Sequence, residues 1–120
     1  MSQSPIPTEI NLHKKSRVLH ITFSNGESFQ YPCHYLRCFS PSAEVQGHSP
    51  GEEVLQVGKE NVNIEQIEQI GVYAVCIHFD DGHNTGIYSW DTLYNLGKNY
   101  PHHWDGYLKR LQEASAGRHA

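Results

Sequence analysis

The stretch VYAVCIHFDDGHNTGIYSWDTLYNL, residues 72–96, decides the fold. Its first part places the apolar residues Val75, Ile77 and Phe79 at every second position. Such alternation is typical of a strand with one buried face, because successive side chains of a strand point to opposite sides. Residues 81–82 are Asp-Gly, a pair that favours a tight hairpin turn. The stretch therefore begins with a predicted β-hairpin.

A helix is predicted directly after the returning strand. Ser89 stands at the position of an N-cap, where its side-chain oxygen can accept a hydrogen bond from the first turn. Asp91 follows in that turn, where the helix dipole favours a negative charge. Trp90, Leu93 and Leu96 are spaced as on one helical face. The stretch thus predicts strand, turn, strand and helix.

The same unit occurs earlier in the chain. Leu19, Ile21 and Phe23 alternate in the same way and stand at one constant offset from their counterparts in the later stretch. A turn of the Asn-Gly type ends at Gly26, and Pro32, whose fixed φ suits the first turn of a helix, opens a short predicted helix. Two copies are too few for a solenoid, so we expect them to pack their apolar faces together.

The correspondence extends past the hairpins, because Tyr31 and Leu36 match Tyr88 and Leu93, with one extra residue in the later copy. A last helix is predicted from Pro101, with a stripe of apolar residues: Trp104, Tyr107, Leu108 and Leu111. The predicted fold class is α+β, with mainly antiparallel sheets from two related β-hairpin–helix units and a C-terminal helix.

A chain of 120 residues is expected to form one domain. We predict a flexible N-terminus over residues 1–8, a single domain over residues 9–114 and a flexible tail over residues 115–120. Within the domain, residues 40–53 are rich in proline and glycine and predict an irregular, mobile loop.

Three further expectations concern single elements. Residues 54–57 favour a short strand. Residues 62–70 do not alternate cleanly, which indicates either a β-bulge or a helical turn. Gly97 is expected just after the end of the helix that begins near Ser89, where a glycine often ends a helix.

Composition excludes several classes of function. The formal net charge is −4 and charged residues make up 18%, so no basic surface favours nucleic acid or a membrane as a partner. The N-terminus has no apolar run typical of a secretory signal, and no stretch is long enough to cross a bilayer. Three widely spaced cysteines do not make a disulfide framework, and we expect a cytoplasmic protein.

Nine histidines direct attention to metal binding. Thiolate and imidazole ligands suit zinc or iron, and the metal site predicted here uses His83 and His48, with Cys38 as a third ligand. His83 is expected at an exposed hairpin tip and His48 in the loop over residues 40–53, so that the two can converge. Ordinary surface histidines remain the alternative, and Cys33 is better interpreted as a core residue than as a ligand.

No catalytic signature emerges. His78-Phe79-Asp80 and His103-Trp104-Asp105 both match the His-X-Asp pair of iron oxygenases, but such an enzyme needs a third ligand and a jelly-roll barrel. The adjacent acidic residues Asp80 and Asp81 are interpreted as a solvated turn, because neighbouring residues of an extended chain point in opposite directions. We therefore expect the chain not to be an enzyme.

Over residues 9–111, the sequence resembles the gamma-butyrobetaine hydroxylase N-terminal-like domain family, a domain of unknown function. The resemblance is carried by Leu36-Arg37, Ser40-Pro41-Ser42-Ala43-Glu44-Val45, Gly47-His48, Phe79-Asp80-Asp81-Gly82-His83, Gly86-Ile87-Tyr88-Ser89-Trp90 and Leu93. It implies a small α+β domain, found alone in bacteria, ahead of the oxygenase domain of carnitine-pathway hydroxylases, and beside Mrp-type ATPases of iron–sulfur cluster assembly.

In the hydroxylases, the resemblance implies a zinc held by three cysteines and one histidine. The histidine falls on His83, whereas the cysteine positions fall on Ser40, Ser42 and Val45, none of which supplies a thiolate. The four-ligand zinc site is therefore not carried over to this chain. His48 belongs to the pattern of the stand-alone domains and is expected to serve a different, weaker site.

Three hypotheses of function follow. The first is a non-enzymatic accessory domain that contacts a protein partner, in the context of iron or iron–sulfur protein maturation. The alternative is a small domain that binds zinc or iron through His83 and His48. The third is an auxiliary domain for an oxoglutarate-dependent oxygenase.

Overall fold

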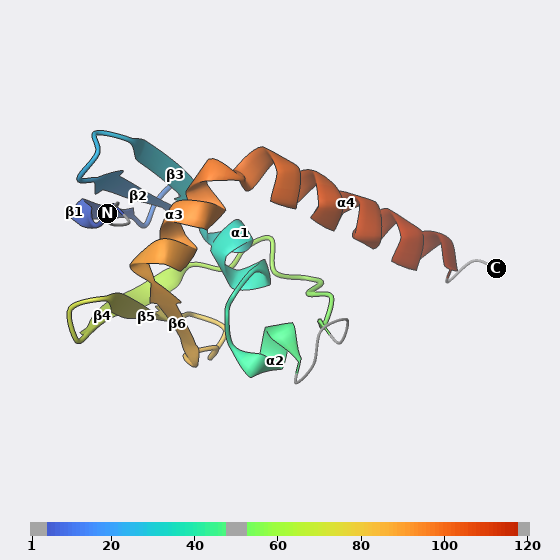
Figure 1. Ribbon diagram of the computed structural model, residues 1–120. Helices are drawn as coiled ribbons and strands as arrows, with labels where there is room; N and C mark the ends of the chain where they lie inside the picture. The colour runs from blue at the N-terminus through green and yellow to red at the C-terminus, as the bar shows by residue number, and fades with distance from the viewer. Residues whose placement is uncertain (1–4, 48–52, 118–120) are drawn as a thin grey trace.

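The computed structural model describes residues 5–47 and 53–117 (Figure 1). The elements follow one another as β1 (Pro7–His13), β2 (Val18–Phe23), β3 (Ser28–Pro32), α1 (Cys33–Cys38), α2 (Ala43–Gln46), β4 (Ile64–Ile70), β5 (Ala74–Phe79), β6 (Gly86–Ser89), α3 (Trp90–Lys98) and α4 (Tyr100–Gly117). The strands form two antiparallel sheets in the orders β1-β2-β3 and β4-β5-β6. The predicted α+β class is confirmed.

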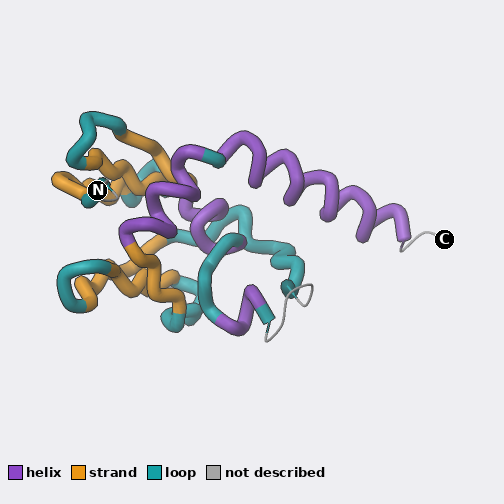
Figure 2. Tube along the Cα trace, in the orientation of Figure 1, coloured by secondary structure: helices purple, strands orange, loops and turns teal. Residues whose placement is uncertain are grey.

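Each sheet is built from one copy of the predicted unit. β2, β3 and α1 form the first copy, and β5, β6 and α3 form the second (Figure 2). The register of β4 against β5 shifts between Ile64 and Gln66, which identifies the irregularity of this segment as a β-bulge. Ser89 caps α3 as predicted, since its side chain accepts a hydrogen bond from the Thr92 backbone N–H.

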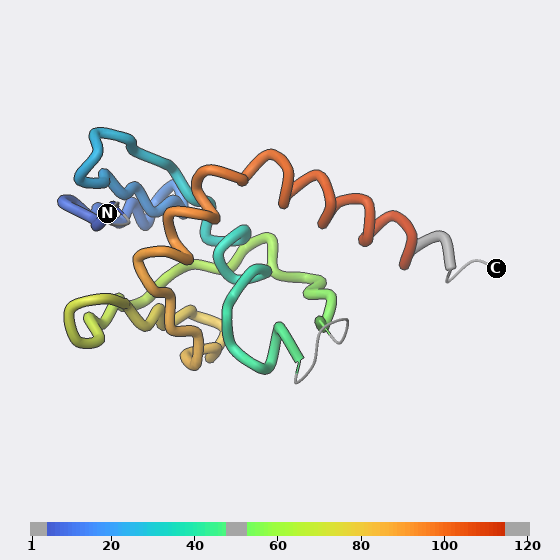
Figure 3. Tube along the Cα trace, in the orientation of Figure 1, coloured from blue at the N-terminus to red at the C-terminus, as the bar shows by residue number. Residues whose placement is uncertain are grey.

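The apolar faces of the two copies meet in one core. Phe23 and Phe79, the corresponding residues of the two hairpins, are each 1% exposed and belong to the same buried cluster. Figure 3 shows the two hairpins on one side of the molecule, although they lie far apart in the sequence. The expectation that the two units bury their apolar faces against each other is confirmed.

Two tyrosine hydroxyls tie the copies together in a reciprocal way. Tyr31, at the end of the first hairpin, donates to the Leu93 carbonyl of α3 at 2.6 Å. Tyr88, its counterpart in the second hairpin, donates to the Leu36 carbonyl of α1 at 2.5 Å. Leu36 and Leu93 are themselves counterparts, so each copy bonds the helix of the other in the same manner.

Several element boundaries differ from those predicted. Gly97 lies inside α3, which ends at Lys98, and not just after the helix. A glycine is needed there because a Cβ would lie 2.5 Å from the ring of Phe29 and 2.8 Å from the Tyr31 hydroxyl. Close approach of strand and helix, rather than helix termination, therefore explains this residue.

The loop predicted over residues 40–53 contains the short helix α2, so its interpretation as wholly irregular was wrong. Residues 48–52 lie outside the described residues, and the predicted mobility there remains a prediction. Residues 54–57 form no strand: Val54 and Val57 are 53% and 50% exposed. The backbone N–H of Val54 donates to the carbonyl of Val45 in α2 at 2.7 Å and not to a neighbouring strand.

The ends of the domain are more regular than predicted. β1 begins at Pro7, within the segment expected to be flexible, and α4 continues to Gly117. Residues 1–4 and 118–120 lie outside the described residues. Along α4, Tyr107 is 1% exposed but Leu108 is 48% exposed, because consecutive residues lie on different faces of a helix. The C-terminal part of α4 extends beyond the rest of the fold (Figure 1). No helix in the described part of the chain is both long and apolar enough to cross a membrane.

The reciprocal tyrosine bonds predict unequal losses of stability. Tyr88→Phe should lower the free energy of unfolding by about 1–3 kcal/mol, because the Leu36 carbonyl lies in the last turn of α1, where it has no helical partner. Tyr31→Phe should cost less, about 1 kcal/mol, because Leu93 lies inside α3. Urea denaturation followed by circular dichroism measures both, with the exposed Tyr73→Phe as the neutral control. If all three variants lost the same negligible amount of unfolding free energy, the proposed role of the two tyrosine hydrogen bonds would be contradicted.

Candidate functional site

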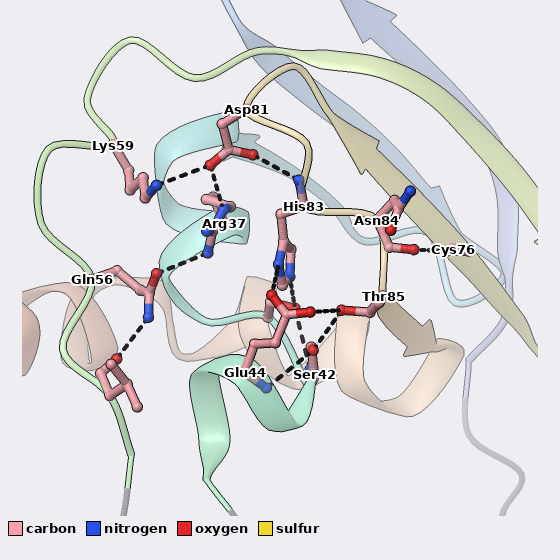
Figure 4. Close-up of polar contacts among 12 residues, drawn as sticks. Arg37, Ser42, Glu44, Gln56, Lys59, Cys76, Asp81, His83, Asn84 and Thr85 are labelled. Carbon is pink, nitrogen blue, oxygen red and sulfur yellow. Dashed lines mark hydrogen bonds and ion pairs between the residues drawn. The ribbon is translucent and has the colours of Figure 1, made fainter.

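The largest group of buried polar and charged side chains among the described residues lies where the β5–β6 turn meets α1 and α2 (Figure 4). The turn contributes Asp81, His83 and Thr85, and the earlier segment contributes Arg37, Ser40, Ser42 and Glu44. We call these seven residues the His83 cluster. The cluster joins two parts of the chain that lie about forty residues apart in sequence.

His83 occupies the centre of this cluster. Its Nε2 lies 2.9 Å from Ser40 Oγ, and its Nδ1 lies 3.4 Å from Glu44 Oε2. Only 2% of its side chain is exposed, so the prediction of an exposed histidine at the hairpin tip was wrong. The reason is that the turn packs on the start of α2: His83 faces Glu44, and Thr85 hydrogen-bonds to Ser42 and Glu44.

Ser40, His83 and Glu44 are connected in the order of a nucleophile, a base and an acid. A serine nucleophile must, however, be reachable by the substrate carbonyl. Ser40 is fully buried, and its hydroxyl also accepts a hydrogen bond from the Ser42 backbone N–H at 3.2 Å. It packs so closely on Gly86 that a Cβ at that position would collide with it. The arrangement can hold the chain together but offers no accessible nucleophile.

A partly buried ion pair supports the other side of the turn, with the side chain of Arg37 8% exposed and that of Asp81 22% exposed. Arg37 Nε donates to Asp81 Oδ2 at 2.8 Å, and Lys59 Nζ lies 3.2 Å from the same oxygen. Arg37 also donates to the Gln56 side chain at 3.0 Å, which ties the irregular segment after α2 to the cluster. Removing one partner of such a pair leaves a buried charge without compensation, which is strongly destabilising.

The environment shifts the protonation of both ionisable groups of the turn. Burial raises the pKa of Asp81, but hydrogen bonds from the His83 backbone and from Arg37 and Lys59 outweigh it and hold that pKa below its usual range. Burial lowers the pKa of His83, and the positive charge of Arg37 lowers it further, against the opposing effect of Glu44. Burial and the Arg37 charge therefore both favour the neutral imidazole of His83.

The three predicted metal ligands are not assembled in the described part of the chain. Cys38 is buried on α1, where its thiol lies beside the Tyr107 hydroxyl, and burial raises its pKa. His83 instead faces Ser40 and Glu44, and His48 lies outside the described residues. Among the described residues, no three histidine, cysteine, aspartate or glutamate side chains form a group that could hold a metal ion. The proposed combination with His48 stays a prediction.

The positions that the family resemblance associates with zinc do come together. Ser40 contacts His83 directly, and Ser42 hydrogen-bonds to Ser40. Val45 is buried in α2, the short helix that Ser42 caps. Zinc prefers thiolate and imidazole ligands, whereas these positions offer two hydroxyls and a hydrocarbon. The residues present do not fit a four-ligand zinc centre. Hydrogen bonds, instead of a metal ion, hold the turn.

Sequence reasoning missed the charged half of the cluster. Asp81 was interpreted as part of a solvated turn, although its carboxylate accepts a hydrogen bond from the Arg37 guanidinium and forms an ion pair with it. Arg37, Glu44 and Asp81 all fall within the motifs that carry the family resemblance, and this was the available signal. Their pairing joins distant segments, so no local pattern could have revealed it.

Comparisons with known proteins agree with this fold. The family described as "Gamma-butyrobetaine hydroxylase-like, N-terminal" matches residues 10–94. Two protein structures solved by NMR in solution are 49% and 43% identical in sequence, both with a TM-score of 0.82. The first match covers 96% of this chain and 86% of the other, and the second covers 94% and 89%.

A third match is a crystal structure of a protein of unknown function from Acidithiobacillus ferrooxidans ATCC 23270, which belongs to the DUF971 family. It is 34% identical, with a TM-score of 0.64, and the match covers 76% of this chain and 91% of the other. No curated protein matches the chain.

The buried histidine predicts a fall in stability at acidic pH. Because the pKa of His83 in the fold lies below its value in the unfolded chain, about 6.5, the unfolded state takes up the proton first. Stability should be constant above about pH 6.5 and decline as the pH falls below it. His83→Gln should make the free energy of unfolding, measured by urea denaturation between pH 5 and 8, fall less steeply as the pH is lowered.

Burial also lowers the pKa of His34 and of His103, so part of the decline should remain in His83→Gln. His34→Gln serves as the matched variant, because it should remove a separate part of the slope. A decline of the same steepness in wild type and His83→Gln would contradict the assignment.

Proposed function

Because the chain belongs to the gamma-butyrobetaine hydroxylase-like N-terminal family, we propose that it is a non-enzymatic accessory domain that contacts a protein partner. The family is one of unknown function, as the DUF971 protein illustrates. The proposed context is iron or iron–sulfur protein maturation. It rests on the proteins beside which such domains are found, according to the resemblance described above.

One observation carries the proposal: the side chains of the His83 cluster that could perform chemistry bind one another and stabilise the fold. Ser40 is fully buried, His83 is 2% exposed, and Arg37 is paired with Asp81. In an active site, such groups must be accessible to a substrate, because the nucleophile has to come within bonding distance of the reacting atom. Here they fix two chain segments against each other.

The cluster thereby presents a rigid polar surface. The side chain of Glu44 is 64% exposed, and its second carboxylate oxygen accepts from the Thr85 hydroxyl at 3.1 Å. Groups held in one geometry before binding lose little conformational freedom when a partner docks. This supports recognition of another protein. Three free, buried cysteines support a reducing compartment, and the location we propose is the cytoplasm.

A metal-binding domain is the second candidate, favoured by one contact. His83 Nδ1 faces the exposed Glu44 carboxylate at 3.4 Å, so an imidazole and a carboxylate already lie together near the surface. Zinc or iron accepts both ligand types. In this candidate His48 supplies the further ligand. An auxiliary role for an oxoglutarate-dependent oxygenase is a variant of the first proposal that differs only in the partner.

Partner capture tests the accessory role. Protein carrying a crosslinker should retain a specific partner from lysate of its own host, identified by mass spectrometry as an iron–sulfur assembly protein or as an oxygenase. Glu44→Arg should reduce that capture at least about tenfold, since it reverses a charge on the rigid surface. Glu113→Arg, at another exposed position, on α4, should leave it unchanged. Recovery of chaperone and ribosomal background alone, in all three proteins, would overturn the proposal.

Metal content decides between the two candidates. Protein purified without an affinity tag should contain no stoichiometric zinc or iron by elemental mass spectrometry if the accessory role is correct. Stoichiometric metal that is lost in His83→Ala would instead establish the metal-binding domain. Circular dichroism of His83→Ala controls for loss of the fold, because the substitution also removes the hydrogen bonds to Ser40 and Glu44.

A further inference from the structure

A second feature lies where α4 joins the rest of the domain. A single residue, Asn99, separates the end of α3 from the start of α4. Pro101, in the first turn of α4, has no backbone N–H to donate to the Gly97 carbonyl four residues earlier, so the hydrogen bonding of α3 cannot continue through it. The chain therefore turns at Asn99, and α4 runs in a different direction from α3 (Figure 1). This residue provides a hinge between the two helices.

α4 is held to the rest of the fold by a small interface. Of the α4 side chains that the structure describes, only Tyr107 is buried, and its hydroxyl donates to the Gln56 carbonyl at 2.5 Å. In the described part of the chain, the buried core cluster of the two sheets contains no residue of α4, although Tyr100 and Trp104 pack against it. The two sheets can therefore keep their core when α4 detaches.

Two histidines lie within this interface, one on each helix. His34 of α1 packs against Trp104 and Tyr107 of α4, with ring centroids 4.8 and 5.8 Å apart. His103 of α4 packs against Phe39 of α1, with centroids 5.4 Å apart. Each helix thus places one imidazole against aromatic rings of the other.

The His34 ring has one nitrogen without a partner. Its Nε2 is buried and has no hydrogen-bond partner among the described residues. A neutral imidazole leaves one nitrogen as an acceptor, whereas the imidazolium carries a proton on both nitrogens. Protonation therefore places a charged N–H against Trp104 and Tyr107. Burying an unpaired charge costs far more than burying an unpaired neutral acceptor.

The charged groups that face the two histidines act in different directions. Burial lowers the pKa of His34, and the carboxylate of Glu60, in the segment before β4, opposes that effect. Burial also lowers the pKa of His103, and the neighbouring His102 lowers it further. Burial raises the pKa of the other titratable groups at the interface and so keeps them neutral: Tyr100, Tyr107 and Cys38.

We propose that α4 is a pH-sensitive strap, which docks on α1 near neutral pH and swings away about Asn99 in acidic solution while the two sheets stay folded. In the detached state His34 and His103 are open to water and take up protons more readily than in the docked state. Detachment is therefore favoured as the pH falls below about 6.5, the ordinary pKa of histidine. It uncovers the aromatic rings that α1 and α4 now cover in each other. The strap does not depend on the proposed accessory role.

NMR of the full chain between pH 5 and 7.5 tests the proposal, because the two tryptophans report on different places. The indole signal of Trp104 should shift as the pH falls below about 6.5. That of Trp90, whose indole donates to the Val72 carbonyl, should stay in place. Amide hydrogen exchange, corrected for its intrinsic pH dependence, should show the opening constant of α4 rising at least about tenfold from pH 7 to pH 5. β2 and β5 should stay protected at both pH values.

Variants identify the groups that take up the protons. His34→Leu removes one titratable group from the interface but leaves an apolar side chain there, and should reduce the acid-induced rise at least about threefold. The double variant His34→Leu/His103→Leu should show no rise. His78→Leu is the matched control, because His78 lies on β5 and faces Glu68 of β4. It should open as the wild type does. The wild-type measurements decide the matter alone if a variant fails to fold.

Three results would overturn the proposal: equal protection of α4 at pH 5 and pH 7, an equal rise in His34→Leu and wild type, or loss of protection in α4 together with β2 and β5. A His34 pKa at or above about 6.5, read from its ring signals, would also overturn it. In that case the aromatic rings of Trp104 and Tyr107 stabilise the imidazolium in the docked state. Partner capture near neutral pH judges the accessory role separately, since α4 is docked there.

Discussion

The structure depends on a pair of exchanged hydrogen bonds. Each copy of the repeated unit sends one tyrosine hydroxyl into the helix of the other, from Tyr31 to Leu93 and from Tyr88 to Leu36. Apolar burial alone is non-directional and would leave two small hairpin units free to slide on each other. A buried hydroxyl that must find its acceptor fixes one relative position, because leaving it unpaired costs more than the bond itself contributes.

The position of the His83 cluster follows from that arrangement. Fixing α1 against β6 places Arg37 and Ser40 beneath the turn that begins after β5, so the His83 cluster forms at one side of the joint. Elsewhere the two sheets contact each other through Lys14, whose Nζ donates to the Glu65 carbonyl of β4 and whose carbonyl accepts from the Asn63 side chain.

The repeat, the helix cap and the shared core were predictable from the sequence because their signals are local. Alternation around Phe23 and Phe79 and the cap at Ser89 need only neighbouring residues to be recognised. The burial of His83 was not predictable, since it depends on Ser40 and Glu44, which approach it only through the fold. Gly97 shows the same limit: a glycine that ends a helix and one that admits a neighbouring ring are indistinguishable in sequence.

The chemistry that fastens the β5–β6 turn has a consequence for how the domain works. A structural zinc contributes roughly 10 kcal/mol or more to folding, whereas a single neutral hydrogen bond contributes about 1 kcal/mol. The bond between Ser40 and His83 therefore cannot hold the turn alone, and the ion pair of Arg37 with Asp81 shares that task. Since these groups are committed to one another inside the fold, the proposed accessory role assigns recognition to what remains outside, the exposed carboxylate of Glu44.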